Sequence, residues 1–235
     1  ISLPSLNEQQ RIVSILDEAL EKLAEKSQHI NSRLNGAKDL FGSYLSDLFS
    51  KKHQGWEEKK VGEVVTLQGG SQPPKAVFSA EYLEGYIRLI QIRDYKSDKH
   101  IVYIPKEKAR KFCTKEDIMI SRYGPPLFQI LRGIEGAYNV ALMKAIPDEQ
   151  YLTKDFLYYF LQNRDLLRYI ERSSSRTAGQ TGFKKETLES YTITYPKYCS
   201  QRTYDTQVIG QGVFHHRLRR CNDYLQAYKQ TDNIL

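Results

Sequence analysis

Apolar residues recur through the first fifty positions at alternating steps of three and four, which puts them on one face of a helix. This sustained heptad predicts an apolar seam that pairs with a second helix, although a helix packed along its own domain would show a similar stripe. Asn7 is a suitable N-cap and Gly55 a suitable stop. The helix-pairing residues expected to form this apolar seam are Val13, Leu16, Leu20, Leu23, Ile30, Leu34, Ala37, Phe41, Tyr44 and Leu48.

The hydrophobic pattern changes after Trp56 to short alternating stretches bounded by glycine and proline, which predict strands. These stretches lie within KVGEVVTLQGG, EGYIRLIQIRDY, KHIVYIP, EDIMISRY, LFQILRG and GAYNVALMKAIP. A helical period returns between Thr153 and Ser173, with Thr153 as its N-cap, and a short helix and a last strand follow before Pro196. Strands combined with one or two helices predict an α+β fold, here with a long protruding coiled-coil helix.

The same pattern divides the chain into three expected parts. Residues 1–52 form the long helix, residues 53–197 the strand-rich domain, and residues 198–235 a tail. The tail has no heptad, and Gly210 and Gly212 would interrupt a helix. Because it offers little apolar surface to bury, irregular structure is the expectation.

The net charge of +7 is concentrated in the middle part, which has 23 Lys and Arg against 18 Asp and Glu. An anionic partner is therefore expected there, although many soluble domains have a similar excess. Three polar loops in this part suit nucleic acid, because Arg and Gln pair with base edges while Ser, Thr and Lys suit phosphates. The candidate DNA-binding residues are Gln68, Ser71, Gln72 and Lys75 in the first loop, Arg122 and Tyr123 in the second, and Ser174, Arg176, Gln180, Thr181, Lys184 and Lys185 in the third.

Motifs of catalysis and cofactor binding are absent from the sequence. It contains no GxGxxG, Walker, GxSxG or HExxH motif and no paired metal-binding carboxylates. Cys113, Cys199 and Cys221 have neither metal-ligand spacing nor the even number of a disulfide framework. We therefore predict a non-catalytic protein without cofactor or metal. No apolar run approaches the length of a membrane span and no signal peptide is visible, so we expect a cytoplasmic protein with no membrane contact.

Several stretches together resemble the specificity subunit of type I restriction–modification enzymes. They are LNEQQRIVSILDEALEKL, KKVGEVVTLQGGSQPP, YIRLIQIRD, EDIMISRYG and TAGQTGFKKETLESYTITYP, and the resemblance covers residues 3–196. The most specific piece is the helix opening, a P-x-L-x-E-Q-x-x-I-V pattern matched by Pro4, Leu6, Glu8, Gln9, Ile12 and Val13.

The resemblance implies a fold and a role. In that family two target-recognition domains alternate with long spacer helices, which form an antiparallel coiled coil and dock the modification subunits. Each recognition domain reads one half of a split DNA target and performs no chemistry. The resemblance therefore implies sequence-specific recognition of double-stranded DNA, with modification (methyltransferase) and restriction subunits as partners.

By the order of parts in that family, a chain that opens on a spacer helix resembles the C-terminal half of such a subunit. In that family a second helix opening is expected after Pro196, but the tail does not have one. One hypothesis is a frameshift, because shifting the codons of Gln207–His216 by one nucleotide permits a sequence close to Ile15–Leu20. Without a second helix, the apolar seam would pair with a second copy and give a homodimer. Two alternatives stay open: a coiled-coil protein-interaction module whose basic domain is incidental, and an inactive truncated remnant without DNA readout.

Overall fold

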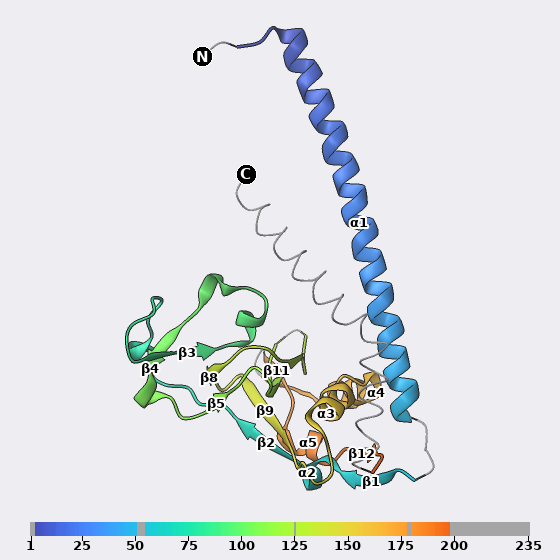
Figure 1. Ribbon diagram of the computed structural model, residues 1–235, viewed down its shortest axis with the longest axis vertical. Helices are drawn as coiled ribbons and strands as arrows, with labels where there is room; N and C mark the ends of the chain where they lie inside the picture. The colour runs from blue at the N-terminus through green and yellow to red at the C-terminus, as the bar shows by residue number, and fades with distance from the viewer. Residues whose placement is uncertain (1–2, 51–54, 125, 178–179, 198–235) are drawn as a thin grey trace. The chain divides into compact units, whose positions relative to one another are not determined.

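The computed structural model describes residues 3–50, 55–124, 126–177 and 180–197, so the predicted tail and its frameshift lie outside the described residues. The described chain falls into two compact units (Figure 1). One contains the first helix as far as Tyr44, and the other starts at Leu45. This division falls inside the helix, before the expected boundary at residues 52 and 53, because Leu45 and Phe49 are buried in the second unit.

Helix α1 runs from Leu6 to Ser50 and confirms the long helix predicted from the heptad. Its cap is Ser5 rather than the predicted Asn7, since the Ser5 Oγ accepts a hydrogen bond from the Glu8 backbone N–H at 3.4 Å. The first five seam residues are between 50% and 62% exposed, and Tyr44 is also exposed. The half-buried members are Leu34, Ala37, Phe41 and Leu48. An apolar row this exposed is typical of a helix that pairs with another helix.

The second unit is built from short strands and helices, which confirms the predicted α+β fold (Figure 1). Its strands are β1 (Glu57–Lys60), β2 (Val65–Gly69), β3 (Tyr86–Ile90), β4 (Tyr103–Pro105), β5 (Phe112–Cys113), β6 (Ile118–Ser121), β7 (Ile130–Leu131), β8 (Gly136–Tyr138), β9 (Leu142–Pro147), β10 (Ser175–Thr177), β11 (Gln180–Gly182) and β12 (Thr192–Tyr195). Its helices are α2 (Val61–Val64), α3 (Lys154–Leu161), α4 (Arg164–Ser173) and α5 (Lys185–Glu189), with 3-10 turns η1 (Lys75–Val77), η2 (Ile92–Tyr95), η3 (Asp98–His100) and η4 (Lys106–Lys108).

The second unit contains two four-stranded sheets. The first is antiparallel with the order β2-β9-β6-β7, and the second has the order β4-β3-β8-β5, in which β3 and β8 run parallel. Strands β1 and β12 pair antiparallel and so join the two ends of the domain, while β10 and β11 form a hairpin. Every residue of β6 and most of β9 are buried, so both faces of the first sheet are covered at its centre.

The single helix predicted over residues 153–173 is two helices, α3 and α4. Thr153 caps the first as predicted, because its Oγ1 accepts a hydrogen bond from the Phe156 backbone N–H at 3.1 Å. The break comes at Asn163, whose Oδ1 accepts from the Asp165 backbone N–H at 2.9 Å and so starts a second helix. The hydrophobic period continues through the break, which is why the pattern alone did not show it.

The last residues of α1 are packed against α3. Phe49 lies edge-on to Phe156 and Phe160, with ring centroids 5.5 Å apart in each pair. Ser46 also donates a hydrogen bond from its Oγ to Asn163 Oδ1 at 3.2 Å. The end of the long helix is therefore part of the core of the domain.

Three segments differ from the predicted strands. GAYNVALMKAIP holds β8 and β9 rather than one strand, because the Asn139 side chain accepts a hydrogen bond from the Ala141 N–H and turns the chain. In the first predicted strand, Val61 and Val64 are both buried at helical spacing and form α2. The short strands β5, β10 and β11 lie in segments without an alternating pattern.

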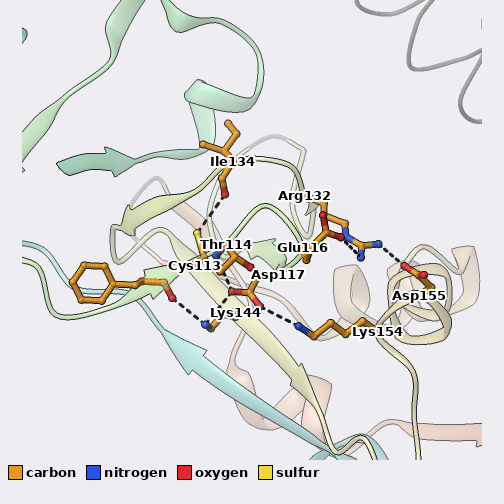
Figure 2. Close-up of polar contacts among 10 residues, drawn as sticks. Cys113, Thr114, Glu116, Asp117, Arg132, Ile134, Lys144, Lys154 and Asp155 are labelled. Carbon is orange, nitrogen blue, oxygen red and sulfur yellow. Dashed lines mark hydrogen bonds and ion pairs between the residues drawn. The ribbon is translucent and has the colours of Figure 1, made fainter. Parts of the chain in front are cut away.

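A network of ion pairs ties β6, β9 and α3 together (Figure 2). The Asp117 carboxylate accepts hydrogen bonds from the Thr114 backbone N–H at 2.9 Å and from Lys144 Nζ at 3.2 Å, and Lys154 Nζ lies 3.8 Å away. Burial works to raise the pKa of Asp117, but the Thr114 N–H and the Lys144 ammonium outweigh it and hold this pKa below its ordinary value.

The substitution Asp117→Asn should lower the free energy of unfolding by about 2 kcal/mol at pH 7, because it leaves the Lys144 ammonium without its anion. A carboxyl with a lowered folded pKa contributes stability above its unfolded pKa and loses it as pH falls. The difference from wild type should therefore shrink below about pH 4. Urea unfolding at several pH values measures it, with Glu84→Gln, which removes an exposed carboxylate, as the control. Equal effects of the two variants would show that the network does not stabilise the fold.

Candidate nucleic-acid interface

The carboxyl ends of β2 and β6 meet at one edge of the first sheet. Both strands pair antiparallel with β9, one on each side of it. In this register Gly69 of β2 and Ile120 of β6 are both partners of Met143. Because neighbouring strands lie about 4.8 Å apart, the two strand ends are about 10 Å from each other. The loops that follow them therefore leave the sheet side by side.

The first of these loops is held against the end of β8. The Gly70 N–H donates to the Leu142 carbonyl at 3.1 Å, and the Ser71 N–H donates to the Tyr138 carbonyl at 3.2 Å. A Cβ on Gly70 would lie 2.0 Å from the Asn139 carbonyl oxygen, so this approach requires glycine. The path of the first loop is therefore fixed by backbone contacts.

Tyr138 orients one candidate side chain of this loop. Burial raises the pKa of Tyr138, and Cys113 and Asp117 add to the effect, so its hydroxyl stays protonated at neutral pH. That hydroxyl donates to Gln68 Oε1 at 2.9 Å, while the amide NH₂ of Gln68 has no hydrogen-bond acceptor among the described residues and can donate to another partner. The remaining candidates of the first loop are half-buried Ser71 and exposed Gln72 and Lys75.

The second loop is joined to the β10–β11 hairpin. Tyr123 forms an isolated antiparallel bridge with Gly182, and a Cβ on Gly182 would lie 2.9 Å from the Tyr123 ring. Phe128 packs edge-on against Phe183, with ring centroids 5.2 Å apart. Two segments that are far apart in the sequence are thereby fixed to each other. We call the surface formed by residues 68–75, 122–124, 126–128, 175–177 and 180–182 the loop edge.

Arg122 starts the second loop at the sheet. Its backbone N–H donates to the Ala141 carbonyl at 2.9 Å, and its guanidinium lies over the Tyr123 ring, 5.3 Å from the centroid. Its Nε atom is buried and has no hydrogen-bond partner among the described residues. The planar fork of a guanidinium suits bidentate pairing with a guanine edge.

The third group of candidates is distributed over the hairpin and its flanks. Of residues 175–177 and 180–181 only the backbone is described, and the register pairs Arg176 with Thr181 and Thr177 with Gln180. Lys184 is exposed just before α5, whereas Lys185 Nζ pairs with Glu189 at 2.9 Å inside that helix. Ser174 donates from its hydroxyl to the Glu171 carbonyl at the end of α4. The side chains of Lys185 and Ser174 therefore make their contacts with helix residues. The hairpin itself is part of the loop edge.

The loop edge presents amides, hydroxyls and cations on loops that a rigid sheet positions, and groups of these kinds contact base edges and phosphates in protein–DNA complexes. Across the described part of the chain, no three His, Cys, Asp or Glu side chains gather closely enough to hold a metal ion. Among the described helices, none combines the length and the apolar character of a membrane span. Sequence reasoning missed Tyr138 and Gly182, which hold the loop edge together. The pairs Tyr138–Gln68 and Tyr123–Gly182 that reveal their roles are contacts of the folded chain.

Comparisons with known proteins point to one family. Residues 53–206 match the family model described as Type I restriction modification DNA specificity domain. No curated protein matches the sequence. Among solved structures, a chain from work on complex assembly and conformational transition of the type I R-M system is 19% identical with a TM-score of 0.63, and covers 97% of this chain and 57% of that one.

Two further solved structures are similar in fold. The HsdS subunit from Thermoanaerobacter tengcongensis is 21% identical with a TM-score of 0.55, over 97% of this chain and 57% of that one. The S subunit of the type I restriction-modification system from M. genitalium is 15% identical with a TM-score of 0.52, over 77% of this chain and 45% of that one. At these identities the likeness shows the fold alone, and the match spans 57% of the first two structures and 45% of the third.

Proposed function

Because the chain belongs to the family of type I restriction modification DNA specificity domains, we propose that its loop edge reads the sequence of double-stranded DNA. The observation that carries the proposal is the shared register of β2 and β6 on β9, which brings the first two loops together. The Tyr123–Gly182 bridge adds the hairpin. Side chains of the loops contact base edges, and basic residues hold phosphates.

The proposed contacts are the candidate residues of the loop edge and its flank. They are Gln68, Ser71, Gln72, Lys75, Arg122, Tyr123, Arg176, Gln180, Thr181 and Lys184. Lys185 adds positive charge but has its ammonium paired with Glu189. In this proposal the chain supplies recognition, and the chemistry of modification and restriction belongs to partner subunits.

Binding of the whole chain to duplex DNA over a series of salt concentrations tests this function. The logarithm of the association constant should fall linearly with the logarithm of salt, with a slope of about −0.9 for each phosphate contact. Fluorescence anisotropy with a labelled duplex gives the slope. Absence of DNA binding, or binding that does not respond to salt, would overturn the proposal.

For α1 we propose docking of a second helix on the apolar seam. The support is the exposure of Val13, Leu16, Leu20, Leu23 and Ile30 on one face. The partner is the helix of a modification subunit or of a second copy of this chain. A coiled-coil module without DNA readout, the alternative function, relies on this same face. It differs from the DNA reader in its salt response, because an apolar seam is insensitive to counterions.

The homodimer predicts a measurable change of mass. Wild-type protein should have a mass near twice 27.4 kDa at high concentration in light scattering. The double substitution Leu16→Asp/Leu23→Asp should give a monomer, because it puts two carboxylates into the apolar seam. Glu21→Gln/Glu25→Gln alters exposed positions off the seam and should leave the mass unchanged. A wild-type monomer at every concentration would contradict the homodimer.

A further inference from the structure

A basic segment outside the loop edge carries much of the charge of the domain. Residues 106–111 read KEKARK, with four cations and one carboxylate, a net charge of +3. Residues 53–197 as a whole have an excess of 23 Lys and Arg over 18 Asp and Glu. This short run, called here the basic segment, has in six residues the same net charge of +3 that the third polar loop has over residues 174–185.

The cations of the basic segment are not neutralised by the fold. Among the residues that the structure describes, none of the side chains of Lys106, Lys108, Arg110 and Lys111 forms an ion pair or a hydrogen bond with another side chain. The first three are exposed and Lys111 is half-buried. Neighbouring cations are different, since Lys115 lies 4.0 Å from a Glu135 carboxylate oxygen. Four unpaired charges in six residues repel one another, which favours binding of an anion.

The backbone under these cations is held in place. The Lys106 N–H donates to the Gly85 carbonyl at 2.9 Å, and the Ala109 N–H donates to the Lys106 carbonyl at 3.1 Å. Ala109 packs against the buried cluster of Leu89, Ile104 and Ala137. The charges are therefore presented from a fixed path along the second sheet. A fixed array of cations loses less conformational freedom on binding than a free tail does.

The basic segment lies beside the loop edge. The Tyr138 N–H donates to the Lys111 carbonyl at 3.2 Å, and the Tyr138 carbonyl accepts from the Ser71 N–H, also at 3.2 Å. One residue at the end of β8 thus separates Lys111 from the first loop. Val77 and Phe78, which follow the first loop, pack on the same buried cluster as Ala109. The basic segment and the first loop therefore share one surface.

We propose that the basic segment is a binding site for the phosphate backbone of DNA, next to the bases that the loop edge reads. The inference rests on the proposed function, because it takes the duplex on the loop edge as its starting point. The cations bind phosphate oxygens and give affinity without sequence information. The loops alone then carry the discrimination between bases.

The double substitution Lys108→Gln/Lys111→Gln tests this role. It should weaken binding on the order of tenfold on every duplex and reduce the salt slope by about 2, since each lysine contact accounts for about one ion. The control is Lys59→Gln/Lys60→Gln on β1, which removes the same charge at the opposite end of β2 from the loops. Anisotropy over a salt series with two unrelated duplexes gives both quantities, and thermal melting checks the fold of each variant.

The outcomes separate the inference from the function on which it rests. A uniform loss with a smaller slope for Lys108→Gln/Lys111→Gln, and near wild-type values for the control, supports the phosphate site. Steep, salt-dependent binding by wild type that this variant retains unchanged overturns the site and leaves the DNA reader intact. Absence of DNA binding by wild-type protein overturns the proposed function and the site together. A second variant, Lys106→Gln/Arg110→Gln, should reproduce the effect if the first is poorly folded.

Discussion

Replacing Gly70 with alanine is expected to lower the free energy of unfolding by about 3 kcal/mol and to remove DNA binding by the first loop. A Cβ at this position would lie 2.0 Å from the Asn139 carbonyl oxygen and 2.8 Å from the Tyr138 carbonyl oxygen. Both atoms belong to the backbone, so no side-chain rotation can relieve the contact. The loop must instead move away from β8, and the Ser71–Tyr138 hydrogen bond must break.

The neighbouring glycine gives a matched control for this substitution. A Cβ on Gly69 meets nothing within 4 Å, so Gly69→Ala should change stability by less than about 0.5 kcal/mol. Urea unfolding and DNA anisotropy on the two variants measure the difference. Equal stabilities of Gly70→Ala and Gly69→Ala would show that the close approach of the first loop to β8 is not a constraint on this fold.

Replacing Arg122 with alanine should weaken binding to the target duplex by about tenfold to a hundredfold and weaken non-target binding much less. The backbone of Arg122 is fixed at the start of the second loop by its hydrogen bond to the Ala141 carbonyl. A bidentate contact to a base edge needs the planar guanidinium and not only its charge. Arg122→Lys should therefore lose most of the discrimination while keeping most of the non-target affinity.

An arginine remote from the loop edge is the control for Arg122. Arg168 on α4 is exposed and pairs with Asp165 at 3.1 Å within its own helix. Arg168→Ala should leave both target and non-target affinities within about twofold of wild type, which is the effect of one distant screened charge. If Arg122→Ala lowers both affinities equally, Arg122 holds a phosphate and does not read a base.

The hydrophobic pattern correctly predicted the elements that have one apolar face or that are buried on both faces. The heptad gave α1, and alternation gave β2, β3, β4, β6, β7 and β12 close to their observed positions. It failed where a polar side chain decides the path. Asn163 divides α3 from α4 and Asn139 divides β8 from β9, in both cases by a local side-chain to backbone hydrogen bond that the apolar period does not register.

Only the residue composition of the loop edge could be predicted from the sequence, and not its arrangement in space. The polar loops around Gln68, Arg122 and Thr181 were identified from residue types. The first two meet at one edge because of the antiparallel register on β9, and the third joins them through the Tyr123–Gly182 bridge. Register depends on which strands pair, and such long-range pairing is not written in any local stretch. The same holds for the basic segment, whose proximity to the first loop depends on Tyr138. The sequence contains the residues of this surface but does not show which of them become neighbours in the folded chain.

Selection from a pool of duplexes with a randomised stretch shows whether the loop edge reads a DNA sequence. The whole chain is bound to the pool at about 0.15 M salt, since specificity is meaningful only at a stated salt concentration. A loop edge that reads DNA predicts enrichment of one short sequence, bound at least about 10³ times more tightly than a scrambled duplex. It also predicts that Arg122→Ala relaxes the enriched sequence at one position. A pool that stays random after repeated rounds, with equal affinity for every duplex, would show that the loop edge does not read a sequence.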